Sequence, residues 1–286
     1  MGEPRVVVGV DGSPLSMAAV ARAAQVASAR GLTLNLLHAF APDLPMLGFG
    51  ALSDESVVTT HTHRLLADAT ARAHAVDPRL TVTTSVRGGY ASQALVDASR
   101  TAALIVIGAM GHGVLSRASV GAVAMQVVAH SRCPILVIGH ETSTPMTTGG
   151  RIVVGVDGSK SSLRALGMAF DEAVLRGGSL DVVNAWQAQS AQDPTLSSES
   201  SWSAYETKLQ NTVESSLASR RAAHPEVKVD YEVVRAEPVQ ALVDRSEGAA
   251  VVVVGSRGTG GFQGLHVGST ALRLVGRSKS PILVIR

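Results

Sequence analysis

Residues 6–13 read VVVGVDGS, and residues 152–159 read IVVGVDGS. In both stretches a run of mostly β-branched residues leads directly into Asp-Gly-Ser. A short, continuous apolar run is typical of a strand buried on both faces, and a serine just after it can cap a helix. The stretch therefore predicts a buried strand followed at once by a helix, and the chain contains it twice.

The sequence around this stretch is repeated as well. QALVD occurs at 93–97 and again at 240–244, while CPILVI at 133–138 is matched by SPILVI at 280–285. Landmarks that recur in the same order and at nearly constant spacing indicate an internal duplication.

The duplication predicts two homologous domains, residues 1–140 and 150–286. The segment between them, HETSTPMTTGG at 140–150, is polar and rich in Thr and Gly, which is typical of a linker. Within each copy, strand and helix patterns alternate. In the first copy we expect strands at 5–10, 33–39, 81–86, 103–107 and 135–138, and helices at 14–30, 53–75, 92–100 and from 121 onward. Strict alternation predicts two tandem α/β domains, each with an open parallel sheet between two helical layers, as in Rossmann-like folds.

Composition fits this architecture and excludes several classes of protein. Hydrophobic residues make up 45% of the 286 residues and charged residues 17%, so each half can bury a sizeable core. The net charge is +2 and there is no basic block, so we expect no DNA or RNA partner. No apolar run approaches the roughly 18 residues of a membrane span, and the N-terminus does not resemble a signal peptide. A single cysteine, Cys133, fits a reducing compartment, and we expect a cytoplasmic protein.

Open parallel sheets bind ligands at the carboxyl ends of their strands. There the first strand of each copy delivers an aspartate, and the fourth delivers two glycines spaced three apart and a third after nine more residues. The aspartates are Asp11 and Asp157, and the glycines are Gly108, Gly111 and Gly121 in the first copy and Gly255, Gly258 and Gly268 in the second. Glycines allow a ligand to approach the backbone closely, and a helix that starts at the third glycine offers free N–H groups to an anion. The pattern predicts a phosphate cradle beside a carboxylate that can hold a ribose hydroxyl or a metal ion.

These residues resemble the universal stress protein family in its tandem two-domain form. That family carries G-x2-G-x9-G-(S/T) after its fourth strand and an aspartate after its first. The V-D-G-S and P-I-L-V-I segments also match, so the resemblance covers nearly the whole chain. It implies a fold of the adenine nucleotide alpha hydrolase type with strand order 3-2-1-4-5. It also implies pairing through the last strands, within the chain and in a homodimer.

The resemblance further implies that each domain binds ATP, with or without Mg²⁺, in a stress or dormancy regulator. The glycine motif would contact ribose and phosphates, the aspartate would lie near the ribose, and the adenine would lie against the backbone at the end of the second strand. Carried over, the nucleotide contacts are Asp11, Ala39, Gly108, Gly111, Gly121 and Ala122 in the first copy, and Asp157, Ala185, Gly255, Arg257, Gly258, Gly268 and Ser269 in the second.

The two copies are not equivalent. Ala122 replaces the Ser or Thr of the motif, whereas Ser269 keeps it, and Met110 stands where the second copy has Arg257. Arg117 lies inside the nine-residue spacer of the first copy. We therefore expect both sites to bind nucleotide, with the second closer to the family pattern.

Several alternatives stay open at this point. Each aspartate can form an Asx turn or a helix cap, and the following Ser13 and Ser159 are expected as helix caps. His112 and His266 lie in the spacers, where the alternative to a structural role is a phosphate contact, while Cys133 is expected as a small core residue.

The function also has alternatives. The chain has no G-x-x-x-x-G-K-[ST], G-x-S-x-G or H-E-x-x-H motif, which argues against the usual nucleotide hydrolases, esterases and metalloproteases. A weak Mg-dependent ATPase built on the aspartate, a cyclic-AMP-binding protein and a nucleotide-free interaction scaffold are the alternatives to an ATP-binding regulator.

Overall fold

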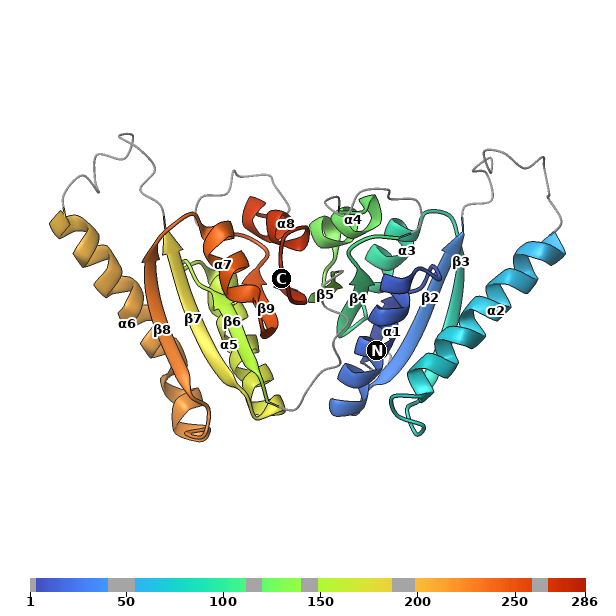
Figure 1. The fold of residues 1–286 in the computed structure, drawn as a ribbon, viewed down its shortest axis with the longest axis horizontal. Coiled ribbons are helices and arrows are strands. Elements are labelled where there is room, and N and C mark those ends of the chain that lie inside the picture. Colours follow the sequence, from blue (N-terminus) through green and yellow to red (C-terminus); the bar gives the residue numbers. More distant parts are fainter. Residues whose placement is uncertain (1–3, 41–54, 112–119, 140–148, 187–198, 259–266) are drawn as a thin grey trace. The chain divides into compact units, whose positions relative to one another are not determined.

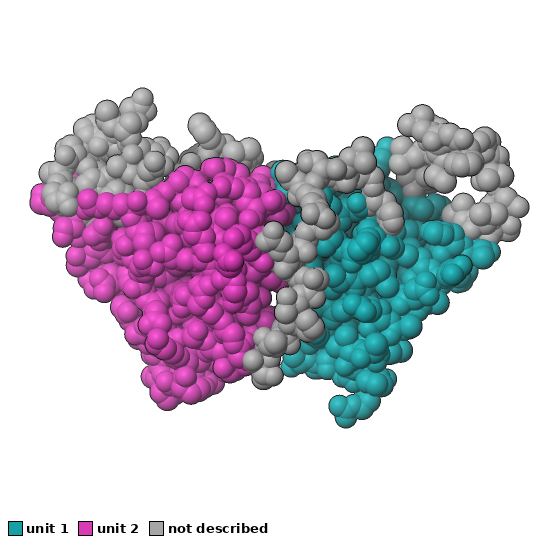
Figure 2. Space-filling model, in the orientation of Figure 1, with its two compact units in different colours: residues 1–146 teal, residues 147–286 magenta. Residues whose placement is uncertain are grey.

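The computed structural model describes residues 4–40, 55–111, 120–139, 149–186, 199–258 and 267–286. The chain divides into two compact units, Met1–Met146 and Thr147–Arg286 (Figure 2). In these described ranges, each unit has five parallel strands that alternate with four helices, and Figure 1 shows their arrangement.

The first unit is a five-stranded parallel sheet with helices on both faces. The strands follow the order β3-β2-β1-β4-β5. Helices α1 and α2 pack against each other, and so do α3 and α4, which gives the two helical layers. The elements are β1 (Arg5–Gly9), α1 (Pro14–Ala29), β2 (Thr33–Phe40), α2 (Glu55–His74), β3 (Val82–Gly88), α3 (Ala91–Ala98), β4 (Leu104–Gly108), α4 (Ala122–His130) and β5 (Ile135–Ile138).

The second unit repeats this arrangement. Its strands follow the order β8-β7-β6-β9-β10, which is the same topology. The elements are β6 (Arg151–Gly155), α5 (Lys160–Arg176), β7 (Ser179–Trp186), α6 (Glu199–Ala223), β8 (Val229–Arg235), α7 (Pro238–Ser246), β9 (Ala249–Gly255), α8 (Ser269–Val275) and β10 (Ile282–Ile285). The predicted α/β fold class and the order 3-2-1-4-5 are therefore confirmed in both copies.

The buried strands and the alanine-rich helix α1 explain how a chain with few aromatic residues builds its cores. Val6 and Val8 of β1 and Ile152 of β6 have no exposed surface. On α1, Ala19 and Ala23 are equally buried, so the helix backbone comes close to the sheet. Close-packed layers of small and β-branched side chains leave little space that a large ring could fill.

The turn from β1 into α1 forms as the opening stretch of sequence predicts. The Ser13 side chain accepts a hydrogen bond from the N–H of Ser16 at 3.2 Å, and Ser159 accepts one from Ser162 at the same distance. Gly12 has a φ of 85°, a left-handed conformation that favours glycine. The predicted caps are confirmed.

In the described part of the chain, no helix is both long and apolar enough to cross a membrane.

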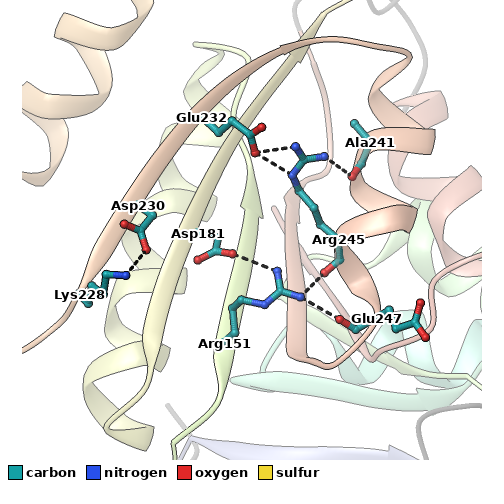
Figure 3. A network of polar contacts seen from close by, with 8 residues as sticks. All are labelled: Arg151, Asp181, Lys228, Asp230, Glu232, Ala241, Arg245 and Glu247. Carbon is teal, nitrogen blue, oxygen red and sulfur yellow. Dashed lines mark hydrogen bonds and ion pairs between the residues drawn. The ribbon is translucent and has the colours of Figure 1, made fainter.

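A polar network beside α7 ties the first strand of the second unit to the end of that helix (Figure 3). Arg151 on β6 donates to Asp181 on β7 at 3.0 Å, and to the carbonyl oxygens of Arg245 and Glu247 at 2.8 Å each. The last carbonyl groups of a helix have no partner within the helix. Arg151 therefore satisfies the end of α7 as well as neutralising Asp181.

Replacing Arg151 with Met should lower the free energy of unfolding by about 2 kcal/mol, because it removes charge-assisted hydrogen bonds from a partly buried site. The matched variant is Arg5→Met in the first unit. Arg5 is exposed and donates to the Thr101 hydroxyl at a long 3.5 Å, so its loss should cost less than about 0.5 kcal/mol. Urea unfolding followed by circular dichroism measures both values, and equal losses would contradict this account of the network.

Candidate functional site

The aspartate after the first strand and the second motif glycine meet at the carboxyl edge of each sheet. A Cβ atom built on Gly111 would overlap Oδ2 of Asp11. In the second unit, a Cβ on Gly258 would lie 2.6 Å from Oδ2 of Asp157. Any side chain at these two positions would therefore displace the carboxylate. The structure brings together in space two residues that lie about 100 positions apart in sequence.

The third motif glycine lies against the turn made by the first two. The N–H of Gly121 donates to the carbonyl oxygen of Ala109 at 2.8 Å, and a Cβ on Gly121 would lie 3.4 Å from Cα of Met110. Gly121 is the N-cap of α4 and supplies no side chain to the helix. The first N–H groups of α4 thus begin beside the Asp11–Gly111 contact, where they give the site a positive electrostatic character.

The second unit has the same arrangement. The N–H of Gly268 donates to the carbonyl oxygen of Ser256 at 2.6 Å, and a Cβ on Gly268 would lie 3.6 Å from the backbone nitrogen of Gly258. The two predicted site residues that follow the third glycine, Ala122 and Ser269, are exposed and open α4 and α8.

The first motif glycine has a packing role. A Cβ on Gly108 would lie 3.0 Å from Cβ of Leu15 on α1, and one on Gly255 would lie 2.7 Å from the backbone carbon of Ser161 on α5. The glycine lets the start of the helix approach the end of the fourth strand. This contact accounts for the glycine independently of any ligand.

Each aspartate uses its two oxygens differently. Oδ1 of Asp11 accepts the N–H of Ser13 at 2.9 Å, and Oδ1 of Asp157 accepts the N–H of Ser159 at 3.0 Å. These are Asx turns, which hold the loop between strand and helix. Oδ2, the other oxygen of each carboxylate, lies beside the second motif glycine.

The predicted adenine positions lie at the carboxyl ends of the second strands. Ala39 on β2 is paired in register with Arg87, and Ala185 on β7 with Val234. Both alanines are partly exposed. The residue before each of them makes a contact that we did not predict from the sequence.

His38 and Asn184, which precede the two alanines, tie the second strand to the end of the first. Nδ1 of His38 lies 2.8 Å from the carbonyl oxygen of Val10, so this nitrogen carries the proton. Asn184 donates to the carbonyl oxygen of Val156 at 2.6 Å. Both are polar residues at equivalent positions of the two copies, and this repetition is the sequence signal by which they could have been predicted.

Helix α6 packs beside the turn that contains Asp157 in the second unit. A Cβ on Gly158 would lie 2.9 Å from Cδ1 of Leu209. Tyr205 lies one turn earlier on α6, and burial together with the negative charge of Asp157 raises the pKa of its phenol. A phenol that stays neutral remains a hydrogen-bond donor near this carboxylate.

Comparison with known proteins identifies the family. The universal stress protein family model matches residues 4–139 and again residues 149–286. This chain belongs to the universal stress protein family. Universal stress protein Rv2623 of Mycobacterium tuberculosis is 33% identical over 291 residues, which cover 98% of this chain and 96% of the relative. A universal stress protein of Mycolicibacterium smegmatis is 30% identical over 290 residues and covers the same shares.

A solved structure supports the fold. The crystal structure of a universal stress protein from Archaeoglobus fulgidus matches with a TM-score of 0.75 and covers 100% of this chain and 99% of that one, at 17% identity. At this identity the likeness extends to the fold alone. The tandem universal stress protein organisation that the resemblance implied is shown by the two matches of the family model.

The two sites of this universal stress protein differ more than the motif suggests. In the second unit, the hydroxyl groups of Ser159 and Ser161 both donate to the carbonyl oxygen of Arg257, the former at 3.3 Å. In the first unit, Leu15 stands at the position of Ser161 and packs on Gly108. The glycine turn is thus hydrogen-bonded to the helix in one copy and held by apolar packing in the other.

Some predicted residues are not covered by the structure. His112, Arg117 and His266 lie outside the described residues. Across the described ranges, no three His, Cys, Asp or Glu side chains gather into a group that could hold a metal ion. Cys133 is buried, and its Sγ contacts the carbonyl oxygen of Pro134 at 3.4 Å, in keeping with the expected core role.

The packing role of the first motif glycine predicts a loss of stability without any ligand. Gly255→Ala should lower the free energy of unfolding by about 3 kcal/mol, because the new methyl group would overlap the backbone of α5. As a control, Gly88→Ala should change it by less than about 0.5 kcal/mol, since nothing lies within 4 Å of a Cβ there. Thermal unfolding of the nucleotide-free protein measures both, and a Gly255→Ala variant as stable as Gly88→Ala would disprove the packing role.

Proposed function

We propose that each unit of this universal stress protein binds an adenine nucleotide, ATP in the first place, and that the protein acts as a nucleotide-dependent regulator of stress or dormancy. The observation that carries the proposal is the contact between an aspartate and a motif glycine beside the start of a helix, made in both units. A turn that a side chain would block, next to free N–H groups, suits a phosphate chain.

Different residues of the site would bind different parts of the nucleotide. The N–H groups at the start of α4 and α8 would hold the phosphates, and Oδ2 of Asp11 or Asp157 would accept a hydrogen bond from a ribose hydroxyl. The base would lie against the backbone at Ala39 or Ala185. Carboxylate and phosphate oxygens are the ligands that Mg²⁺ prefers, so each aspartate also fits a nucleotide-bound Mg²⁺.

The alternatives predict different behaviour of the purified protein. A regulator that senses nucleotide would retain intact ATP, which mass analysis of a denatured extract would show. A weak ATPase would release phosphate in the presence of Mg²⁺. A cyclic-AMP-binding protein would yield that nucleotide instead, and a scaffold would yield none.

The proposal includes the setting in which the protein acts. We place it in the cytoplasm, on the grounds of its single cysteine. We also propose that it forms a homodimer, as the family resemblance implies. Light scattering of the full chain tests the dimer, and a mass of one chain at all concentrations would contradict it.

Asp157→Asn provides a clean test of the site, because the amide oxygen can still accept the N–H of Ser159 while the negative charge is lost. We expect the variant to fold and to bind ATP about tenfold more weakly at the second site, since a charge-assisted hydrogen bond becomes a neutral one. Asp11→Asn should do the same at the first site. Isothermal titration calorimetry of each variant measures these affinities.

Two further variants each block nucleotide binding at one of the two sites. Gly111→Glu and Gly258→Glu place a large acidic side chain where the carboxylate already lies, and each should reduce the number of bound ATP molecules from two to one per chain. The double variant should bind none. ATP binding by the double variant as strong as by the unmodified protein would refute the proposed site.

A further inference from the structure

Two cations at the second site stand out from the other basic residues nearby. Arg257, in the glycine turn, and Lys160, at the first position of α5, are both exposed. Within the described part of the chain neither side chain has an ion-pair partner. Four basic residues elsewhere in the second unit are bonded to neighbours: Arg245 to Glu232, Arg273 to Glu237, Arg277 to Gln240 and Lys279 to Glu247.

The backbone of Arg257 is bonded to the two serines that flank Lys160 in the sequence. The Ser159 hydroxyl donates to the carbonyl oxygen of Arg257 at 3.3 Å, and Lys160 is the next residue along the chain. The Ser161 hydroxyl donates to the same oxygen and accepts from the N–H of Arg257, the latter at 3.3 Å. Since Ser161 is buried, these bonds fix the peptide that carries Arg257 against the start of α5.

The first unit has none of these features at the same positions. Pro14 replaces Lys160, Met110 replaces Arg257, and Leu15 replaces Ser161. The spacer of the first copy contains one cation, Arg117, at a position that has glycine in the second copy. The cations Lys160 and Arg257 therefore have no counterpart at the equivalent positions of the first unit.

We propose that Arg257 and Lys160 make the second site selective for a polyphosphate chain, so that it distinguishes a nucleoside triphosphate from an uncharged nucleoside more strongly than the first site does. The inference rests on the proposed nucleotide site and names the part of the ligand that this copy recognises. Ser161 is a positioning residue, which acts by holding the peptide of Arg257.

The physical reason is that cations on a fixed backbone attract the phosphate chain and leave the nucleoside unaffected. A guanidinium can donate two parallel hydrogen bonds to phosphate oxygens, and an ammonium acts as a point charge. Exposed charges are screened by salt, so the preference for triphosphate should weaken as ionic strength rises. Met110 and Pro14, at the same positions in the first unit, are uncharged and do not attract the phosphate chain in this way.

The experiment uses the full chain with Gly111→Glu, so that only the second site binds. Calorimetry measures the affinities for ATP and for adenosine at low and high salt. We expect Arg257→Met and Lys160→Met each to weaken ATP binding about tenfold while adenosine binding changes less than twofold. Ser161→Ala should lower the ratio of ATP to adenosine affinity in the same direction. Arg277→Met, which removes a cation already bonded to Gln240, is the matched control and should leave the ratio unchanged.

A gain-of-function pair completes the test. In the Gly258→Glu background, where only the first site binds, Met110→Arg and Pro14→Lys should together raise the ratio of ATP to adenosine affinity about tenfold or more. Circular dichroism and the Tm of each variant establish that it is folded.

The outcomes separate the two proposals. If the Gly111→Glu protein binds neither ATP nor adenosine while the Gly258→Glu protein binds both, the inference about the second site fails and the proposed function holds for the first. If neither protein binds either ligand, the proposed function fails as well. If the second site binds ATP and the folded Arg257→Met and Lys160→Met variants keep its ratio, the inference alone is overturned.

Discussion

The contact between the aspartate after the first strand and the glycine after the fourth is the constraint on which both sites depend. One carboxylate oxygen is held inside the chain's own turn, and the other lies where a side chain at the glycine would have to be. The end of one strand therefore fixes the course of the loop that follows its neighbour. The third glycine then rests on this loop and sets where the next helix begins.

How much of this could be predicted from the sequence depends on the range of the interaction. The path from strand through Asp-Gly-Ser into a helix is determined by neighbouring residues, and VVVGVDGS predicted it, including the Ser13 cap. The order of the strands is determined by packing across the whole unit, and it was available only through the resemblance to a known family.

The site shows the same limit. The ligand role predicted for the first motif glycine stays a prediction, and the structure adds a packing role, because Gly255 admits the backbone of α5. The sequence contains no local signal for this contact, because its partner, Ser161, lies in a different element. His38 and Tyr205 were not predicted for the same reason, since His38 bonds to Val10 and Tyr205 interacts electrostatically with Asp157, both distant along the chain.

The duplicated architecture also has a spectroscopic consequence. The chain contains two tryptophans, Trp186, which ends β7 directly after Ala185, and Trp202 in α6, and both belong to the second unit. Intrinsic tryptophan fluorescence therefore originates in one copy only. In a protein whose two halves share a fold, this emission provides a built-in label for events in the second half, against a first half that contributes none.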